Sequence, residues 1–321
     1  MKKVIILVGP TGAGKTGIST LLAQDLKTEI ISADSMQIYR HMDIGTAKPT
    51  PEERRSIRHH MIDITEPDET FSTGKYIEMV VPVIEDLHNR GKIPVVVGGT
   101  GLYIKAMTRG IFSGPSADWA LREELLSLEE EERGSLYDHL KKLDPMAAGR
   151  ITPNDRRRII RALEVCLRSS LSISIMQENL TRALPYDFIK IGITRERKEL
   201  YRMIEERVDQ MLRLGLIDEV KNVTDLIEQR RQRRGDTEQR GPLPSMQAIG
   251  YKEIAMFLRG EIPLDEAVRL IKKGTKRYAK RQFTWFSKED NIHWVDITGI
   301  RNSGEAFLQI GSVLERLFAR R

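Results

Sequence analysis

The sequence predicts an α/β fold in which helices cover both faces of a parallel sheet and a helical insertion interrupts the chain. The first observation is a set of short apolar runs with the length of buried strands, at Lys3–Val8, Glu29–Ser32, Ile93–Val97 and Phe188–Ile193. The second is that helical patterns separate these runs, which favours parallel pairing. The third is a region from Pro115 to about Pro185 that shows helical periods and no strand-like run.

The first strand, a glycine-rich turn, a helical pattern at Thr16–Leu26 and the second strand form a βαβ unit. Another helical stretch, Tyr76–Asn89, precedes the third strand, which is followed by Gly98 and Gly99. The carboxyl ends of parallel strands share one rim of the sheet, where ligands bind in open α/β folds. We therefore expect functional residues directly after the strands.

The strand-free region divides the chain into domains. Residues 1–114 and 186–321 are assigned to an α/β core with a basic helical C-terminal part, and residues 115–185 to a helical insertion domain. After the fourth strand, an amphipathic helix is predicted at Arg195–Arg213, with Gly215 as its terminator. The polar stretch Gln229–Arg240 is predicted to be a mobile loop, and further helix is expected from Gln247 onward.

Composition limits the class of protein. The 321 residues are 40% hydrophobic, which is enough for a substantial core. Cys166 is the single cysteine, so no disulfide can form within the chain, and we expect a reducing, cytoplasmic location. The N-terminal apolar run is too short for an export signal or a membrane span, so no membrane partner is expected. The oligomeric state stays open, with a monomer favoured.

The positive charge is concentrated at one end of the chain. Residues 191–321 contain 26 Lys and Arg against 20 Asp and Glu, which equals the whole net charge of +6. A basic region joined to a neutral one favours a polyanionic partner such as nucleic acid, although this balance also occurs in proteins that have none.

A phosphate-binding motif lies between the first strand and the helix that follows it. It consists of Gly9, Pro10, Thr11, Gly12, Ala13, Gly14, Lys15 and Thr16 and matches G-x-x-x-x-G-K-[ST]. The glycines let backbone N–H groups point at phosphate oxygens, and the helix N-terminus adds partial positive charge. Lys15 supplies a point charge and Thr16 a hydroxyl for Mg²⁺. The alternative, a tight turn with an incidental lysine, explains fewer of the fixed positions.

The motif predicts phosphate binding without specifying phosphoryl transfer. Ile93–Val97 is followed by glycines, where many P-loop nucleotidases have an acidic residue for the metal. A hydrolase or motor is therefore disfavoured. The fold class is accordingly a P-loop NTPase-like parallel sheet core with the helical insertion.

Asp34 follows the second strand and should lie on the same rim as the phosphate loop. A carboxylate there could accept a proton from an incoming nucleophile. It could equally be the N-cap of the next helix, a position that aspartate fills well. Position alone does not decide between these two roles.

Several segments together resemble the bacterial tRNA dimethylallyltransferases. They are GPTGAGKT at 9–16, ISADSMQIYRHMDIGTAKP at 31–49, GGTGLY at 98–103, NDRRRIIRALEV at 154–165, PSMQAIGYKE at 244–253 and YAKRQFTWF at 278–286. The match runs in order over nearly the whole chain and is least clear at 229–240. The resemblance implies transfer of a dimethylallyl group from dimethylallyl diphosphate to N6 of the adenosine at tRNA position 37, just 3′ of the anticodon, with Mg²⁺ and release of diphosphate.

The resemblance also implies roles for residues near the phosphate loop. Asp34 becomes the general base for the N6 amine, Thr100 a contact beside the target base, and Arg207 a contact to the diphosphate. Thr100 could instead cap the helix after Gly98 and Gly99, and Arg207 could pair with neighbours of Glu205 on a solvated face.

The tRNA partner would be bound through its anticodon stem-loop, with the target base flipped out of the stack. By resemblance, the predicted contacts are Asp34, Ser35, Met36, Gln37, Thr100, Arg157, Arg158, Ile159, Ile160, Arg161, Met246, Gln247, Gly250, Tyr251, Lys273, Arg277 and Arg281. Without the resemblance, the arginines of the 157–161 segment would be assigned to a solvated basic face. Lys273, Arg277, Lys280 and Arg281 share a helical face whose other side should bury Ile271, Tyr278 and Trp285.

Two other functions stay open at this point. A small-molecule or nucleoside kinase would need the phosphate loop but no arginine-lined insertion. A non-catalytic, nucleotide-gated RNA-binding protein would use Asp34 only as a cap.

Overall fold

The structure is a computed structural model that describes residues 1–169, 171–235 and 243–319. The strands are β1 (Lys3–Val8), β2 (Ile30–Ser32), β3 (His59–His60), β4 (Val95–Gly98), β5 (Asp187–Thr194) and β6 (Ile292–Asp296). They form one parallel sheet in the order β3-β2-β4-β1-β5-β6. The prediction of a parallel α/β sheet is confirmed, and β1 lies near its centre.

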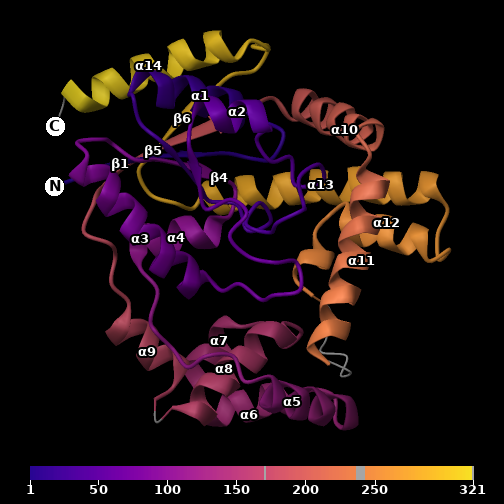
Figure 1. Cartoon of the computed structure of the whole chain (residues 1–321). Helices are drawn as coiled ribbons and strands as arrows, with labels where there is room; N and C mark the ends of the chain where they lie inside the picture. Colours follow the sequence, from indigo (N-terminus) through magenta and orange to yellow (C-terminus); the bar gives the residue numbers. More distant parts are fainter. Residues whose placement is uncertain (170, 236–242, 320–321) are drawn as a thin grey trace. The chain divides into compact units, whose positions relative to one another are not determined.

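Helices cover both faces of this sheet. The helices before the insertion are α1 (Lys15–Asp25), α2 (Pro51–Ser56), α3 (Thr73–Asn89) and α4 (Gly101–Arg109), and the last helix is α14 (Ser303–Ala319). Figure 1 shows α1 and α14 on one side of the sheet and α3 and α4 on the other. Alternate residues of β1 explain this arrangement, because Ile5 and Leu7 pack into one core with Ile18 of α1 and Ile310 of α14.

A second core lies among the C-terminal helices. These are α10 (Arg197–Arg213), α11 (Leu216–Arg234), the short 3-10 helix η1 (Ser245–Gln247), α12 (Tyr251–Leu258) and α13 (Leu264–Phe286). Val220 of α11, Ile254 of α12 and Ile271 of α13 pack against Ile38 and Met42, which follow β2. The segment after β2 is therefore held by helices that come much later in the chain.

The chain divides into two compact units. Unit 1 comprises Met1–Ile104 and Pro185–Arg321, and unit 2 comprises Lys105–Leu184. Unit 2 contains α5 (Trp119–Glu131), α6 (Ser135–Leu143), α7 (Pro145–Arg150), α8 (Arg156–Arg168) and α9 (Ile173–Leu180), and no strand among its described residues. It has its own core around Leu136, Leu140 and Leu163. The compact unit begins at Lys105, ahead of the predicted boundary at 115, because Met107 accepts the Leu184 N–H and Gly110 packs against the Arg182 backbone at the other end of the unit.

Several elements differ from the sequence prediction. The sequence carries no clear strand pattern for β3 and β6, since β3 has two residues and β6 has an exposed His293 and Trp294 between Ile292 and Val295. The predicted loop at 229–240 is wrong for its first part: α11 continues through Arg234, and Gly235 caps it in the left-handed conformation. Residues 236–242 lie outside the described residues.

The prediction that Trp285 is buried is also wrong. Its side chain is 37% exposed, whereas Ile271 is buried as expected and Tyr278 is half-buried. Within the described ranges, no helix is both long and apolar enough to cross a lipid bilayer.

Candidate active site at the strand ends

The phosphate loop connects β1 to α1 as predicted. Gly9, Gly12 and Gly14 all have positive φ angles, and a Cβ on Gly9 would lie 2.7 Å from the carbonyl oxygen of Ile193 in β5. Glycine is therefore required for both the conformation and the space. The loop packs directly on the neighbouring strand, and the N-terminus of α1 opens at its end.

Two buried side chains hold the loop from behind. Arg195, which follows β5, donates from Nε to the Ala13 carbonyl at 3.1 Å and from Nη2 to the Ile300 carbonyl at 2.7 Å. Gln282 of α13 accepts the Thr11 N–H at 2.7 Å and donates to the Gly99 carbonyl at 2.9 Å. Gln282 thereby joins the phosphate loop to the turn after β4. Gln282 is not among the site residues predicted from the sequence, although it lies within the segment 278–286 that carries the resemblance.

Lys15 bends back over the loop and donates from Nζ to the Gly9 and Pro10 carbonyls, each at 2.9 Å. Burial lowers the pKa of Lys15 to about 8, opposed by the negative charge of Asp34 and reinforced by the positive charge of Arg207. The three side chains therefore interact electrostatically. A bound diphosphate would supply the negative charge that Lys15 lacks here.

Asp34 lies on the rim because β2 and β4 approach closely at their ends. A Cβ on Gly98 would lie 2.1 Å from the Ala33 carbonyl oxygen, and the Thr100 N–H donates to that same oxygen at 3.1 Å. One carboxylate oxygen of Asp34, Oδ1, accepts the N–H groups of Met36 at 2.8 Å and Gln37 at 3.3 Å. The carboxylate thus caps the following turn, as one of the two interpretations expects, and Oδ2 takes no part in that cap.

Thr100 and Arg207 also reach this rim. Thr100 Oγ1 accepts the Ser35 N–H at 2.9 Å, so its side chain joins the ends of β2 and β4. Arg207 of α10 donates to Thr11 Oγ1 at 3.4 Å, and burial lowers its pKa while Asp34 raises it. Glu205 pairs with Lys276, and Arg207 forms no salt bridge with any described residue, so the ion pair on a solvated face considered for Arg207 is not found among them.

Gln37 is bound inside the protein. Its amide nitrogen donates to the Thr46 carbonyl at 3.3 Å and the Ala47 carbonyl at 3.2 Å, and its amide oxygen accepts the Ser32 hydroxyl at 3.1 Å. In this structure the Gln37 amide is therefore bonded within the protein, and its contact with tRNA stays a prediction. Ser35 and Met36 are half-buried beside it.

Some predicted tRNA contacts have buried side chains. Ile159 and Ile160 of α8 are 2% and 8% exposed and belong to the core of unit 2. Tyr251 is 0% exposed, and its hydroxyl donates to Glu219. Their side chains are therefore not exposed, because the family segments that contain them also carry core positions, and their assignment to tRNA stays a prediction. Gly250 is buried and caps α12, Met246 is half-buried, and Gln247 is exposed.

The arginines of α8 differ from one another. Arg161 donates to the buried carboxylate of Glu164 at 2.5 Å and to the Pro115 carbonyl at 3.0 Å. Its guanidinium is thus engaged within unit 2, and its predicted contact with tRNA stays a prediction. Arg158 pairs with Asp155 at 3.3 Å. Arg157 is exposed and forms no ion pair within the described part of the chain.

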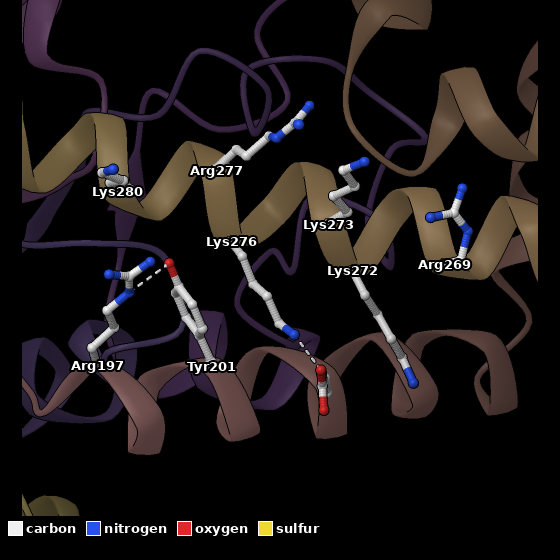
Figure 2. Close-up of a pocket in the computed structure, with 9 residues that line it drawn as sticks. Arg197, Tyr201, Arg269, Lys272, Lys273, Lys276, Arg277 and Lys280 are labelled. Atoms are coloured by element: carbon white, nitrogen blue, oxygen red, sulfur yellow. Dashed lines mark hydrogen bonds and ion pairs between the residues drawn. The ribbon is translucent and has the colours of Figure 1, made fainter.

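Helix α13 has a basic surface beside α10 (Figure 2). The groove between the two helices is lined by Arg197, Tyr201, Glu205, Arg269, Lys272, Lys273, Lys276, Arg277 and Lys280. Lys272 pairs with Asp209 at 2.6 Å and Lys276 with Glu205, both on α10. Lys273 and Arg277 point away from α10 in Figure 2 and form no ion pair with any described residue. Arg281 is exposed on the same helix and lies over the ring of Tyr278.

The phosphate loop after β1, on the same rim of a parallel sheet as Asp34 after β2, defines a P-loop protein. A sequence model described as IPP transferase matches residues 37–289, and the chain belongs to this family.

Similar proteins and structures agree with this assignment. The chain is 57% identical over 316 residues, 98% of each sequence, to a tRNA dimethylallyltransferase of Thermodesulfovibrio yellowstonii. It is 46% identical to a tRNA dimethylallyltransferase of Thermotoga maritima, over 98% of this chain and 96% of that one. The crystal structure of the Bacillus halodurans tRNA isopentenylpyrophosphate transferase matches with 41% identity and a TM-score of 0.70, over 98% and 96% of the two chains.

A eukaryotic dimethylallyltransferase acting on tRNA has a similar structure with 29% identity and a TM-score of 0.78. The match covers 98% of this chain and 80% of that one. The resemblance stated from the sequence is thereby confirmed at the level of the family, and the P-loop NTPase-like fold with it.

Proposed function

We propose that this protein transfers a dimethylallyl group from dimethylallyl diphosphate to the exocyclic N6 of an adenosine next to the tRNA anticodon. The observation that carries the proposal is the placement of Asp34 on the rim beside the phosphate loop, where Lys15 lies over the loop, Arg207 donates to Thr11, and both cations interact electrostatically with Asp34. It brings a carboxylate for proton transfer together with cations for a leaving diphosphate.

The residues divide the reaction between them. N6 forms a bond to C1 of the dimethylallyl group as the bond from C1 to the diphosphate oxygen breaks. The N–H groups of the loop, Lys15 and Arg207 stabilise the charge that develops on the leaving diphosphate. Asp34 takes the proton that N6 loses, and Oδ2 suits this role because Oδ1 already accepts two backbone N–H groups.

A magnesium ion fits the residues around the loop. No cluster of three or more His, Cys, Asp or Glu side chains suited to a metal occurs in the described ranges. Mg²⁺ prefers substrate phosphate oxygens and water over such clusters, with one or two ligands from the protein. Thr16 at the start of α1 is the residue that would hold it, and the ion would neutralise charge on the diphosphate.

For the tRNA, we propose two exposed basic surfaces as phosphate contacts. The first lies on α8 and includes Arg157. The second lies on α13 and consists of Lys273, Arg277 and Arg281. Ser35, Met36 and Thr100 line the rim beside Asp34 and are assigned to the target base. The base would have to leave its stack to reach them.

The proposal is tested by incubating the protein with tRNA and dimethylallyl diphosphate and analysing nucleosides by mass. A gain of one dimethylallyl group on an adenosine is expected, dependent on both substrates. Phosphorylation of a small molecule without tRNA would instead support a kinase. Tight RNA binding with no mass change would support a binding protein without catalysis.

Asp34→Asn tests the general base within the same assay. Asparagine retains an oxygen to accept the Met36 and Gln37 N–H groups, so fold and tRNA affinity should be kept. The single-turnover rate should fall by ~10²–10⁴-fold, the usual contribution of a general base. Asp34→Ala, which also removes the cap, should in addition lose about 1 kcal/mol of stability. A fully active Asp34→Asn protein would leave Asp34 as a cap only.

A further inference from the structure

The segment after Asp34 is held in place by a carboxylate from a distant helix. Three successive backbone N–H groups point at Glu219 of α11: Asp43 and Ile44 donate to Oε2 at 2.9 and 2.7 Å, and Gly45 donates to Oε1 at 2.9 Å. The Tyr251 hydroxyl of α12 donates to Oε1 as well. Four donors therefore converge on one carboxylate. Successive backbone N–H groups of this kind form an anion-binding loop, and here the bound anion is the side chain of Glu219.

The loop that receives Glu219 needs outside support. His41 and Ala47 have positive φ angles of 65° and 47°, which non-glycine residues rarely adopt. A Cβ on Gly45 would lie 2.5 Å from the Tyr251 ring and 2.9 Å from Leu216, so the loop packs closely on α11 and α12. Such backbone conformations persist when the surroundings impose them.

A short series of contacts leads from this loop to the active site. Thr46 and Ala47, next to the residues that Glu219 holds, accept both hydrogen bonds of the Gln37 amide nitrogen. Gln37 in turn donates its backbone N–H to Asp34 Oδ1. Lys48, whose side chain is 1% exposed, ties the same loop to Tyr39 O at 2.6 Å and Asp63 at 2.5 Å. The position of the Asp34 turn thus depends on the loop that Glu219 fixes.

We propose that Glu219, assisted by Tyr251, is a positioning residue for the reaction: it fixes the loop that orients Asp34 and the base-contacting residues after it. This inference rests on the proposed function and adds a second group of residues to it. It also gives Tyr251 a role within the segment 244–253 that does not require contact with RNA.

The test uses the full chain with Glu219→Gln and Tyr251→Phe, and Glu228→Gln as the control. Glu228 lies on the same helix, is exposed and forms no ion pair among the described residues, so its substitution makes the same change of charge. Four quantities are measured: amide exchange of residues 36–48, single-turnover transfer rate, affinity for inorganic diphosphate, and melting temperature.

For Glu219→Gln we expect faster exchange at Asp43, Ile44 and Gly45 and a transfer rate lower by about 10–100-fold, the effect of misplacing reacting groups. Diphosphate affinity should stay within about twofold of wild type. Glu219 accepts hydrogen bonds from the 43–45 loop, at 2.7–2.9 Å, and from the Tyr251 hydroxyl, and none of these donors belongs to the phosphate loop. Tyr251→Phe removes one donor and keeps the ring, so it should slow the same step to a smaller extent. It provides the test should Glu219→Gln fail to fold.

The outcomes separate the two proposals. If wild type and control form product and either Glu219→Gln or Tyr251→Phe transfers the group as fast as wild type, the positioning role is overturned. A lower melting temperature with an unchanged rate also overturns it, since Glu219 would then stabilise the fold only. No product from wild type and control contradicts the proposed function itself.

Discussion

At the scale of single residues, the active site depends on side chains that serve two purposes. Asp34 caps a turn through Oδ1 and influences Lys15 and Arg207 through its charge. The two roles considered for it from the sequence are therefore compatible, because a carboxylate has two oxygens. Thr100 likewise directly precedes α4, and its hydroxyl oxygen accepts the Ser35 N–H.

Lys15 should make diphosphate binding depend on pH. Its pKa in the free protein is about 8, below the usual 10.5, because burial disfavours the charged form. The charged form binds diphosphate, so Lys15 must take up a proton on binding once the pH exceeds its free pKa. Affinity for inorganic diphosphate, measured calorimetrically, should fall as pH rises above about 8, by up to about tenfold per pH unit.

Lys15→Met is the matched variant for this prediction, since it keeps the length of the side chain and cannot ionise. Its weaker binding should lack the part of the pH dependence that is due to Lys15, leaving only the titration of diphosphate. Identical pH profiles for the two proteins would show that another group takes up the proton.

At the scale of elements, α13 combines support and recognition on different faces. Gln282 and Phe286 are buried, Lys272 and Lys276 pair with α10, and Lys273 and Arg277 are exposed. A helix of 23 residues has enough turns to divide these tasks, because its faces repeat every 3.6 residues. The exposed stripe is the part available to a polyanion.

Replacing Lys273 and Arg277 by Gln should weaken tRNA binding and reduce its salt dependence. For each RNA phosphate that is no longer neutralised, the slope of log affinity against log salt is expected to fall by about 0.7–0.9. Lys272 and Lys276, replaced by Gln together, provide the control with the same change of charge, and should alter the slope less because Asp209 and Glu205 already neutralise them. Equal slopes for the two double variants would remove the distinction between these faces.

At the scale of the whole molecule, the two compact units have separate hydrophobic cores. The cores around Ile5 and around Tyr251 belong to unit 1, and the core around Leu140 belongs to unit 2. The phosphate loop, Asp34, Thr100 and Glu219 all lie in unit 1. Diphosphate binding should therefore be separable from the stability of unit 2.

Leu140→Ala tests this separation, since Leu140 is 0% exposed in the core of unit 2. The substitution should lower the free energy of unfolding of unit 2 by about 2–5 kcal/mol. Diphosphate affinity, measured at a temperature where both units are folded, should not change. Weaker diphosphate binding by the folded variant would mean that the core of unit 2 also supports the phosphate loop.

Local sequence determined the phosphate loop, β1, β2, β4, β5, α1 and α3, because each is specified by neighbouring residues with a clear period or a fixed spacing. The place of Asp34 followed from the rule that parallel strands end on one rim, whereas Thr100 followed from the family resemblance. The short β3 and the mixed pattern of β6 carry too little local signal, and their pairing with longer strands stabilises them.

The tertiary structure alone decided which polar residues meet. Gln282 with Thr11, Glu219 with the 43–45 loop and Arg161 with Pro115 are contacts between segments far apart in the chain. The burial of Ile159, Ile160 and Tyr251, read from the sequence as RNA contacts, was decided in the same way. A local sequence pattern predicts which face of a helix or strand is apolar. Which residue of another element lies against that face depends on tertiary packing, and so on residues far away in the sequence.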